Sequence, residues 1–449
     1  MTRNPAPVTP PVVLTVAGSD SGGGAGIQAD LKTIEAGGAF GTSAVTSVTA
    51  QNTTGVESTH VLPVEEIRAQ CEAVRSDFDV AAVKTGMLAT TPVIDLVTDQ
   101  VAATEAPSVV DPVMVAASGD RLLEPDAEDA YESLVAEATL VTPNADEAEV
   151  LTGIDVDDTA SARAAGEAVV EMGAEGALVK GGHVPGEEVA DILVTGESVE
   201  HIRHPRIETD ATHGSGCTLS SAIATRLAYG DDPSVAVQTG VDLLARAVRY
   251  NVDVGEGPGA VHHMVAVRDR AEREPAAERV HDVLARFVDW DVSPLVPEVG
   301  MNVVGATPYA EVPAECAAVE GRISSTVDGV AATRGVRFGA SSHVARFLVA
   351  AREFDADLRF AVNCRFDDEL GEALDALDAP VVEFDRDAEP EAARTMQWGA
   401  RRAFETSEAT PAAVVDRGAV GKEPMTRLLA PDAATLADRT FAVLDALPE

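Results

Sequence analysis

A glycine-rich turn that opens into a helix is the stretch with the clearest chemistry. Within Thr209–Ala222, the residues Gly214, Ser215, Gly216 and Cys217 precede apolar residues at helical spacing. The unpaired N–H groups of a helix start, together with the helix dipole, favour a negative charge above them. Phosphoryl transfer needs such a site, because negative charge accumulates on the transferred group. We therefore predict that Gly214, Ser215 and Gly216 form an anion hole.

Cys217 stands at the mouth of this predicted anion hole. Because a helix start stabilises a thiolate, we expect the thiol of Cys217 to have a lowered pKa and to act as a base or lie close to one. The alternative is an ordinary glycine-rich helix start with a buried cysteine. The stretch taken alone leaves both interpretations open.

A second glycine-rich loop lies near the start of the chain. Val12–Ala17 predicts a buried strand, the loop Gly18–Asp30 follows, and a helix then runs to about Gly37. No Gly-Lys-Ser/Thr follows the glycines and no acidic residue ends a matching second strand, so neither a P-loop nor a dinucleotide fingerprint is present. The glycines allow the backbone to approach a small ligand closely, and we expect Asp20 to hydrogen-bond that ligand.

Strands and helices then alternate along the first half of the chain. The predicted strands are Thr42–Thr49, Val80–Thr85, Ser108–Val113, Leu140–Thr142 and Ala177–Lys180. The predicted helices are Val64–Asp77, Thr91–Thr104, Ala127–Ala136, Asp146–Thr152, Ala160–Met172 and Val235–Tyr250. This alternation predicts an α/β fold with a mainly parallel sheet and helices on both faces.

Polar residues follow five of these strands. They are Gln51-Asn52, Lys84-Thr85-Gly86-Met87, Asp111-Pro112-Val113-Met114, Thr142-Pro143-Asn144-Ala145-Asp146-Glu147 and Lys180-Gly181-Gly182-His183. Ligands of open parallel sheets bind at the carboxyl ends of the strands. We therefore expect these side chains to gather with the anion hole at one site.

Residues 12–263 resemble the ribokinase-like hydroxymethylpyrimidine/phosphomethylpyrimidine kinases of thiamine biosynthesis, the ThiD type. The motifs that carry this resemblance are Ala17–Asp30, Ala50–Thr53, Lys84–Leu88, Asp111–Met114, Thr142–Glu147, Val179–His183, His213–Thr218 and Val261–His263. General ribokinases have an aspartate as base after the last glycine of the anion hole. A cysteine there, as at Cys217, is typical of this pyrimidine-kinase branch and of some pyridoxal kinases.

The resemblance implies that the first domain binds an aminopyrimidine. The amide of Gln51 can donate to a ring nitrogen and accept from the exocyclic amine. Gly18, Asp20 and Met87 would line the flat ring, although Met87 fits a core position better than a contact.

The resemblance also implies ATP and Mg²⁺ as cofactors. Asp111 and Glu147, with Asn144, would hold Mg²⁺ against the nucleotide phosphates, since Mg²⁺ prefers carboxylates and water. Lys180 would neutralise the triphosphate, and Cys217 would take the position of the base. We interpret His213 as a cap of its loop, and His262 and His263 as packing residues at the end of the domain.

The rest of the chain predicts a second, smaller α/β domain. We place the first domain at 1–265, a charged linker at 266–276 and the second domain at 277–449. A new helix is expected after the linker. Further predicted strands are Asn302–Val304, Val336–Gly339, Ala361–Cys364 and Val381–Phe384, and further predicted helices are Val344–Arg352 and Glu369–Leu377.

This second domain resembles the ThiN-type thiamine-phosphate synthases. The matching stretches are Met301–Val303, Val319–Ile323, Gly339–His343 and the glycines and following residues of Gly418–Met425. The resemblance implies catalytic roles for Arg322 and His343, and Lys422 would assist Arg322 in binding diphosphate. An arginine-rich surface that only pairs with the abundant acids is the alternative. Relatives that lack the Arg and His resemble ligand sensors.

The charge balance limits the partners of the chain. The 449 residues include 75 Asp and Glu against 33 Lys and Arg, and the net charge is −42. Such a surface makes nucleic acid an unexpected partner, and no run of apolar residues is long enough to predict a membrane span or signal peptide. The four cysteines form no CxxC pair, which argues against a zinc site and fits a reducing cytoplasm. We expect a cytoplasmic homo-oligomer, a dimer.

The sequence therefore predicts a bifunctional thiamine enzyme. Its first domain would phosphorylate 4-amino-5-hydroxymethyl-2-methylpyrimidine to the monophosphate and then the diphosphate. Its second domain would condense the diphosphate with thiazole phosphate to give thiamine phosphate. The alternative is a pyrimidine or pyridoxal kinase whose C-terminal domain is a non-catalytic thiamine-phosphate sensor.

The acidic, lysine-poor composition also predicts a halophilic protein from a salt-rich cytoplasm. Salt shortens the Debye length from about 10 Å at 0.1 M to about 3 Å at 1 M, which screens the repulsion among the acidic side chains. Urea titrations and kinase assays at roughly 0.1 M and 1 M KCl should therefore show higher stability and activity at the higher salt. Equal fold stability and activity at both concentrations would contradict the hypothesis.

Overall fold

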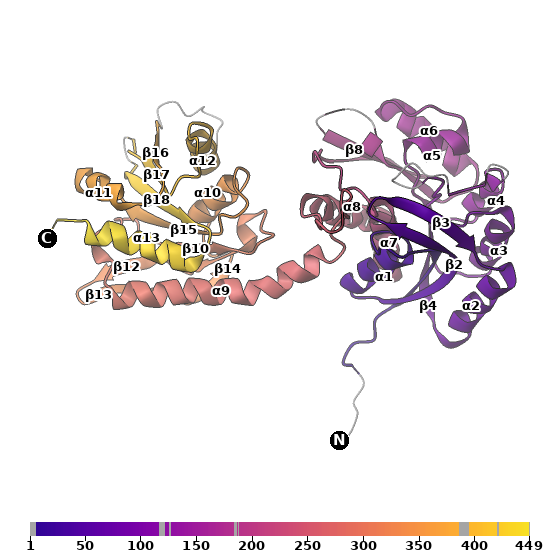
Figure 1. Cartoon of the computed structure of the whole chain (residues 1–449), viewed down its shortest axis with the longest axis horizontal. Helices are drawn as coiled ribbons and strands as arrows, with labels where there is room; N and C mark the ends of the chain where they lie inside the picture. The colour runs from indigo at the N-terminus through magenta and orange to yellow at the C-terminus, as the bar shows by residue number, and fades with distance from the viewer. Residues whose placement is uncertain are drawn as a thin grey trace, which may run out of the picture. The chain divides into compact units, whose positions relative to one another are not determined.

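The computed structural model divides the chain into two compact units, residues 1–266 and 267–449. It describes residues 6–115, 122–124, 127–183, 186, 188–385, 395–419 and 422–448. Figure 1 shows the elements of both units, which are described separately below.

The first unit is built on a nine-stranded sheet with the order β3-β2-β1-β4-β5-β6-β7-β8-β9. The strands are β1 (Val12–Asp20), β2 (Phe40–Asn52), β3 (Gly55–Val61), β4 (Val80–Thr85), β5 (Ser108–Val110), β6 (Leu140–Val141), β7 (Gly176–Val179), β8 (Glu188–Thr195) and β9 (Val199–Pro205). The six neighbouring strands β2, β1, β4, β5, β6 and β7 pair in parallel. At the two edges of the sheet, β3 pairs antiparallel with β2, and β8 and β9 continue antiparallel from β7.

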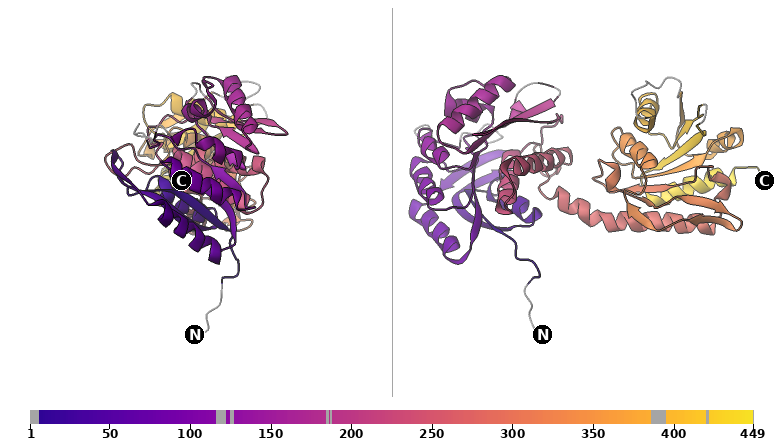
Figure 2. Two further views of the ribbon diagram at one scale, coloured as in Figure 1. Left: turned by 90° about the vertical axis from the view of Figure 1, so that its right-hand side faces the viewer. Right: turned by 180° about the vertical axis from the view of Figure 1, so that it is seen from behind.

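Helices cover both faces of this sheet (Figures 1 and 2). They are α1 (Gly26–Ala36), α2 (Val64–Asp77), α3 (Thr91–Ala102), α4 (Tyr131–Ala136), α5 (Ala145–Thr152), α6 (Thr159–Glu171), α7 (Ser215–Ala228) and α8 (Pro233–Arg249). Neighbouring strand residues point to opposite faces. Accordingly Leu14 packs in a core with α2, α3 and α4, whereas Val13 packs in a core with α1, α7 and α8.

The expectation of a mainly parallel sheet with helices on both faces is confirmed for this unit. Predicted strand Val80–Thr85 and predicted helix Val64–Asp77 have the bounds of β4 and α2. The sequence analysis did not predict β3, β8 or β9. Five of the seven residues of β3 are polar or glycine, and apolar and polar residues do not alternate along it. This edge strand therefore lacks the apolar signal on which strand prediction depends.

The second unit has a seven-stranded sheet with the order β14-β11-β10-β15-β18-β17-β16 and a small β12-β13 pair. The strands are β10 (Val303–Ala306), β11 (Cys316–Val319), β12 (Ile323–Thr326), β13 (Gly329–Ala332), β14 (Val336–Phe338), β15 (Phe360–Arg365), β16 (Val381–Phe384), β17 (Ala413–Asp416) and β18 (Met425–Ala430). The helices are α9 (Val265–Asp289), α10 (His343–Ala351), α11 (Asp368–Ala373), α12 (Thr395–Glu405) and α13 (Ala433–Asp445).

This second sheet is mostly antiparallel, with β16 and β17 as its parallel pair. Its two faces again hold separate cores. Phe360 and Val362 of β15 face the core made with α9, α11 and α13, and Ala361 between them faces the core made with α10 and α12. The unit is thus a smaller α/β domain, as expected.

The expected linker 266–276 lies inside α9, which begins at Val265 and contains Pro275. We expected a linker or a solvated helix start here, followed by a new helix, because Arg268–Glu274 is nearly all charged. Ala, Glu and Arg are good helix formers, so this stretch can continue the helix on both sides of the proline. Its charge is also not all solvated, since Asp269 is buried and accepts a hydrogen bond from Thr307.

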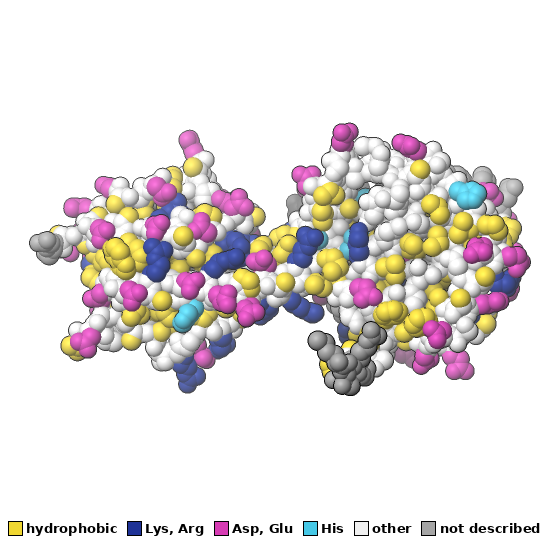
Figure 3. All heavy atoms as spheres, turned by 60° about the horizontal axis from the view of Figure 1, so that its bottom comes forward, with side chains coloured by type: hydrophobic (Ala, Val, Ile, Leu, Met, Phe, Trp, Pro, Cys, Tyr) yellow, Lys and Arg dark blue, Asp and Glu magenta, His cyan; other side chains and the backbone are white. Residues whose placement is uncertain are grey.

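Acidic side chains are scattered over the face drawn in Figure 3 rather than gathered in one patch. All four cysteines are free. Among the described residues, no helix has both the length and the hydropathy that crossing a bilayer requires.

Candidate functional site

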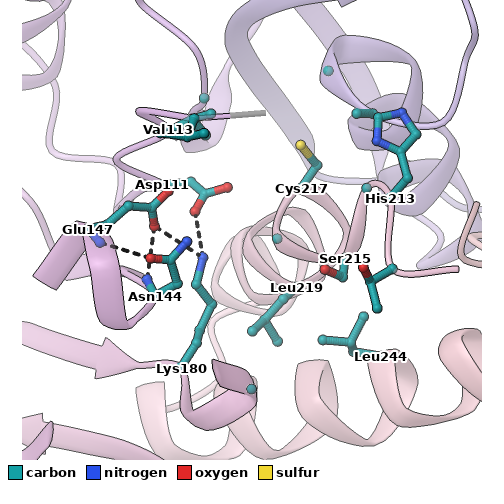
Figure 4. A pocket seen from close by; sticks show the side chains of 18 of the residues that line it. Asp111, Val113, Asn144, Glu147, Lys180, His213, Ser215, Cys217, Leu219 and Leu244 are labelled. Carbon is teal, nitrogen blue, oxygen red and sulfur yellow. Dashed lines mark hydrogen bonds and ion pairs between the residues drawn. The ribbon is translucent and has the colours of Figure 1, made fainter. Parts of the chain in front are cut away.

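One cavity of about 590 Å³ in the first unit collects the predicted site residues. It lies at the carboxyl ends of the parallel strands and is closed by the starts of α5 and α7 (Figure 4). Its lining includes Gly18, Asp20, Gln51, Met87, Asp111, Asn144, Glu147, Lys180, Gly214, Ser215, Gly216 and Cys217. The structure therefore brings the glutamine, the glycine-rich helix start and the carboxylate residues to one place.

The start of α7 is formed by a glycine that no other residue can replace without strain. Gly214 is the N-cap and has φ +83°, in the left-handed region that favours glycine. A Cβ at Gly214 would lie 1.8 Å from the carbonyl oxygen of Gly24, so the two glycine-rich loops pack directly against each other. A Cβ at Gly216 would lie 3.5 Å from both Oδ2 of Asp111 and Nζ of Lys180. The helix start thus faces these two charged groups.

Asp20 holds the first glycine-rich loop. Its carboxylate accepts hydrogen bonds from the backbone N–H groups of Gly22, Gly24 and Ala25 at 2.7, 3.0 and 2.8 Å. Nε2 of His213 lies 3.2 Å from the same carboxylate. The Asp20 carboxylate, expected to hydrogen-bond the ligand, is therefore committed to this loop, and the His213 ring ties the loop to the approach to α7.

His263 braces the start of α7 from behind. Its Nδ1 lies 2.8 Å from Oγ1 of Thr218, which also donates to the carbonyl oxygen of Gly214 at 2.8 Å. Burial lowers the pKa of His263 to about 4, and the charge of Lys32 acts in the same direction. The ring is therefore neutral near pH 7, which fits a packing residue.

Two buried carboxylates meet one lysine at the other end of the cavity (Figure 4). Nζ of Lys180 lies 3.1 Å from Oδ1 of Asp111 and 3.7 Å from Oε2 of Glu147. Burial raises the pKa of Glu147, and the charge of Asp111 raises it further. Asn144 caps α5: its Oδ1 accepts from the N–H of Glu147, whose Oε2 accepts from the N–H of Asn144. This capping box fixes the Glu147 side chain toward Lys180.

The expected low pKa of Cys217 is wrong. Burial raises the pKa of this thiol to about 11, against a favourable charge at Lys84, and the charges of Asp30 and Asp111 raise it as well. We had considered only the helix start, which favours a thiolate. The nearby carboxylates and the loss of solvent outweigh it, so the thiol is protonated near neutral pH.

Gln51, Gly18 and Met87 line the opposite side of the same cavity. Oε1 of Gln51 accepts a hydrogen bond from Oγ1 of Thr49 at 3.2 Å. A Cβ at Gly18 would lie 2.8 Å from Oγ of Ser47, which explains why a glycine stands there. Met87 is only 8% exposed and yet reaches the cavity, so it serves as core and as lining.

Sequence reasoning missed two parts of this cavity. One is an apolar part with Leu219 on α7 and Leu244 and Val248 on α8. These residues have no distinctive pattern, because they look like any apolar face of a helix. The other is Lys84, which the strand-end motif contained but to which we assigned no role, and its buried partner Asp30.

In the second unit, the resemblance motifs form a connected turn. The side chain of Asn302 pairs with the backbone of Val319, donating to its carbonyl oxygen at 2.9 Å and accepting from its N–H at 3.1 Å. The turn after β11 places Gly321 and Arg322 both at φ +80°, and positive φ is uncommon for arginine. The exposed guanidinium of Arg322 donates to the carbonyl oxygen of Val299.

His343 begins α10 beside several arginines. Burial lowers the pKa of its ring, and the charges of Arg346, Arg322 and Arg427 lower it further. Of these, Arg427 is 4% exposed and stacks on the Phe347 ring at 5.1 Å. The charges of Arg322 and Arg427 thus both act on the His343 ring. Sequence reasoning missed Arg427, because one arginine among many carries no signal.

Lys422 is linked to this group by the next residue in the chain, Glu423, rather than by its own side chain. The carboxylate of Glu423 accepts from the N–H groups of Glu298 and Val299, next to the carbonyl that Arg322 contacts. The Lys422 side chain is exposed, and within the described part of the chain it forms no hydrogen bond or ion pair with Arg322 or His343. Gly421 of the same motif lies outside the described residues.

The pair Asp111 and Glu147 fits a magnesium ion. Mg²⁺ in kinase sites is bound through one or two carboxylates and the substrate phosphates rather than by a full protein cage. Consistent with this, the described residues contain no group of three or more His, Cys, Asp or Glu arranged to hold a metal. The buried carboxylates also stand beside Lys180 and Gly216, where phosphates would need countercharge.

Comparison with known families divides the chain in the same way. Residues 20–262 match the family model described as phosphomethylpyrimidine kinase. Residues 279–441 match the model described as thiamine-phosphate synthase ThiN.

Curated relatives and solved structures match the first unit. A hydroxymethylpyrimidine/phosphomethylpyrimidine kinase of Streptomyces coelicolor is 49% identical over 59% of this chain and 98% of its own length. The thiamine biosynthesis bifunctional protein ThiED of Geobacter sulfurreducens is 44% identical over 58% of this chain and 54% of its own length. The pyridoxal kinase of Staphylococcus aureus, solved with AMP-PCP and pyridoxal, is 30% identical with a TM-score of 0.54, covering 58% of this chain and 96% of that one.

The neutral, buried ring of His263 predicts a pH-dependent loss of stability. Its pKa is lowered from 6.5 to about 4 in the fold, so the unfolded chain binds the proton more readily in that range. The free energy of unfolding therefore falls as pH drops from 6.5, by at most about 3 kcal/mol in total, and this contribution levels off below pH 4.

Urea unfolding of the wild type and of His263→Asn across this pH range isolates the contribution, because asparagine does not titrate and other acids titrate in both proteins. We expect the two curves of unfolding free energy against pH to converge as pH falls. Parallel curves would contradict a neutral, buried His263.

Proposed function

The chain belongs to the phosphomethylpyrimidine kinase family, and we propose that it is a bifunctional enzyme of thiamine biosynthesis. Its first unit transfers phosphate from ATP to 4-amino-5-hydroxymethyl-2-methylpyrimidine and then to the resulting monophosphate. The observation that carries this proposal is the shared cavity, in which Gln51, the start of α7 and the Asp111–Glu147–Lys180 cluster all take part.

The pyrimidine binds between the glycine-rich loop and Met87 in this proposal. The amide of Gln51 reads the aminopyrimidine edge, with one donor and one acceptor on the same group. The loop that Asp20 holds by three backbone hydrogen bonds forms a fixed wall, so the flat ring meets a surface that does not need to rearrange. Preorganised positioning of this kind lowers the entropic part of the barrier.

ATP binds with its phosphates between the start of α7 and Lys180. The N–H groups of Gly214 and Gly216 and the Lys180 ammonium supply the positive charge there. The N–H of Ser215, which the sequence placed in the same anion hole, instead donates to the carbonyl oxygen of Thr212 at 3.0 Å. The apolar part of the cavity, with Leu219 and Leu244, suits the nucleotide base. Asp111 and Glu147 hold Mg²⁺, which when bound neutralises phosphate charge.

Cys217 lies where the hydroxymethyl oxygen would approach the phosphoryl group. With a pKa of about 11 its thiol is a hydrogen-bond partner in the resting enzyme rather than a ready base. We assign it the orientation of the hydroxymethyl group and, after its own proton has passed to solvent, the receipt of the hydroxymethyl proton by the thiolate during transfer.

The second unit joins the pyrimidine diphosphate to thiazole phosphate. Diphosphate leaves the pyrimidine CH₂ and the thiazole nitrogen takes its place. Arg322 stabilises the leaving diphosphate, supported by Lys422, and His343 binds a phosphate or donates a proton. The left-handed backbone at Arg322 supports this role, since such conformations cluster at functional sites.

Two alternatives have lower support. Pyridoxal kinases are among the similar solved structures, but those are 30–31% identical to this chain, whereas the curated pyrimidine kinases reach 49%. A second unit that only senses thiamine phosphate would not need Arg322 and His343 beside each other.

We further propose a halophilic, cytoplasmic homo-oligomer, a dimer, with the kinase domain at 1–265, a linker at 266–276 and the synthase domain at 277–449. The net charge of −42 and the four free cysteines support the first two of these proposals.

The kinase assignment predicts two successive products. Incubation of the chain with the pyrimidine alcohol, ATP and Mg²⁺ at molar KCl should give the monophosphate and then the diphosphate by mass spectrometry. Cys217→Ser should lower kcat by about 100-fold or more, because a group that handles the proton is changed. The same variant should still form thiamine phosphate from supplied diphosphate and thiazole phosphate. A monophosphate that never becomes the diphosphate would favour a pyridoxal kinase.

The synthase assignment predicts the reverse separation. Arg322→Ala should lower thiamine phosphate formation from supplied diphosphate by about 100-fold or more, since one charge-stabilising group is lost, and should leave both kinase steps unchanged. Arg334→Ala is a matched control, because Arg334 is exposed in the same unit and forms an ion pair with Glu320, away from Arg322 and His343 in sequence. If the wild type forms no thiamine phosphate but binds it, the sensor interpretation is correct.

A further inference from the structure

A charged cluster lies directly behind Cys217, inside the first unit. Nζ of Lys84 donates to both carboxylate oxygens of Asp30, at 2.8 and 3.0 Å, and both side chains are fully buried. The hydroxyls of Thr15 and Ser221 donate to the same carboxylate at 2.6 and 2.8 Å. We call Thr15, Asp30, Lys84 and Ser221 the Lys84 cluster.

Within the Lys84 cluster, the hydrogen-bonding capacity of the Asp30 carboxylate is filled, whereas that of the Lys84 ammonium is not. Asp30 accepts four hydrogen bonds, which matches what a carboxylate can take. The Lys84 ammonium has three hydrogens, and its bonds to Asp30 use two of them. One N–H of a buried cation therefore remains for another acceptor.

The Lys84 ammonium lies at the wall of the cavity. A Cβ at Gly86 would lie only 2.9 Å from Nζ of Lys84, and Gly86 and Lys84 both line the cavity. Cys217 and Ser221 lie one turn apart on α7, and Ser221 already reaches the Asp30 carboxylate. The ammonium thus lies beneath the same helical turn that carries the thiol.

The charges around Cys217 come from four elements besides its own helix. They are Lys84 on β4, Asp30 on α1, Asp111 after β5 and Lys180 after β7. Lys84 is the main group that favours the thiolate, and the Lys180 charge and the backbone N–H of Gly26 favour it as well, whereas the two carboxylates oppose it. In turn, burial alone would lower the pKa of Lys84, but the charge of Asp30, followed by those of Cys217 and Asp111, holds it above its ordinary value. The ammonium is therefore permanent.

We propose that Lys84 is a positioning residue for phosphoryl transfer, whose buried ammonium, held by Asp30, provides the countercharge for a Cys217 thiolate. This proposal rests on the kinase function proposed above.

The proton balance of the step is complete. The Cys217 thiol releases its proton to solvent, and Lys84 stabilises the thiolate that remains. The thiolate then takes the proton of the hydroxymethyl group, while that oxygen bonds to the γ-phosphorus and the bond from this phosphorus to its bridging oxygen breaks. Cys217 ends as a thiol, and ADP, the phosphorylated pyrimidine and one proton are the net products.

Alkylation of Cys217 by iodoacetamide tests the proposal without any kinase substrate, because only the thiolate reacts. Peptide mass spectrometry reports Cys217 separately from Cys71, Cys316 and Cys364, which are buried. Lys84→Met should slow the alkylation of Cys217 about tenfold or more, since one pKa unit changes the thiolate fraction tenfold below the pKa. Asp30→Asn removes an opposing charge and should speed it.

The opposite directions separate this role from a structural one. A loosened site would expose Cys217 and speed alkylation in both variants. Because Lys84→Met leaves a buried aspartate without its cation and so destabilises the fold, the double variant Lys84→Met/Asp30→Asn is compared with Asp30→Asn and should again react more slowly. Arg163→Met is the control: Arg163 is exposed on α6 and pairs with Glu167 of the same helix, so its change should leave alkylation unchanged.

Kinase assays complete the test. Lys84→Met should lower kcat by about 100-fold while KM for the pyrimidine changes little, as expected when proton transfer alone is affected. Alkylation of Cys217 as fast in folded Lys84→Met as in the wild type, or as fast in the folded double variant as in Asp30→Asn, would overturn the proposal. A wild type that phosphorylates no pyrimidine would instead overturn the kinase function and leave the alkylation result to stand by itself.

Discussion

The contact between two glycine-rich loops is the constraint on which the first unit depends. Gly214 can cap α7 only because it has no side chain, since a Cβ there would meet the carbonyl oxygen of Gly24 at 1.8 Å. Asp20 and His213 then hold the two loops together by hydrogen bonds. This seat puts the positive end of a helix next to a loop that can approach a flat ring. In the proposed function, the phosphate site and the pyrimidine site thus share one wall.

The electrostatics around that wall are balanced in pairs rather than by single charges. Lys180 faces Asp111 and Glu147 on one side, and Lys84 faces Asp30 on the other. Cys217 lies between a cation and several carboxylates, which is why its pKa does not follow the helix start alone. A buried carboxylate with a raised pKa, such as Glu147, is also the kind of group that a bound cation would favour in its charged form.

Much of this could be predicted from the sequence, where the signal was local. β4 and α2 have the predicted bounds, because the residue patterns of apolar strands and amphipathic helices can be recognised within a few residues. Asp111, Glu147 and Lys180 follow β5, β6 and β7, and their place after predicted parallel strands was enough to assign them to one site. The polar edge strand β3 and the buried pair Asp30–Lys84 could not be found, because their meaning depends on partners distant in the chain. The prediction of a low pKa for Cys217 was wrong for the same reason, and the effect of Arg427 on His343 was missed for the same reason.

The most direct test of the central claim is a crystal structure with a non-hydrolysable ATP analogue and the pyrimidine alcohol bound together. The account predicts the γ-phosphate on the N–H groups of Gly214, Gly216 and Cys217, the ring against Gln51, and the hydroxymethyl oxygen between the γ-phosphorus and Sγ of Cys217. A γ-phosphate bound elsewhere, with those N–H groups turned to solvent or to protein side chains, would contradict it.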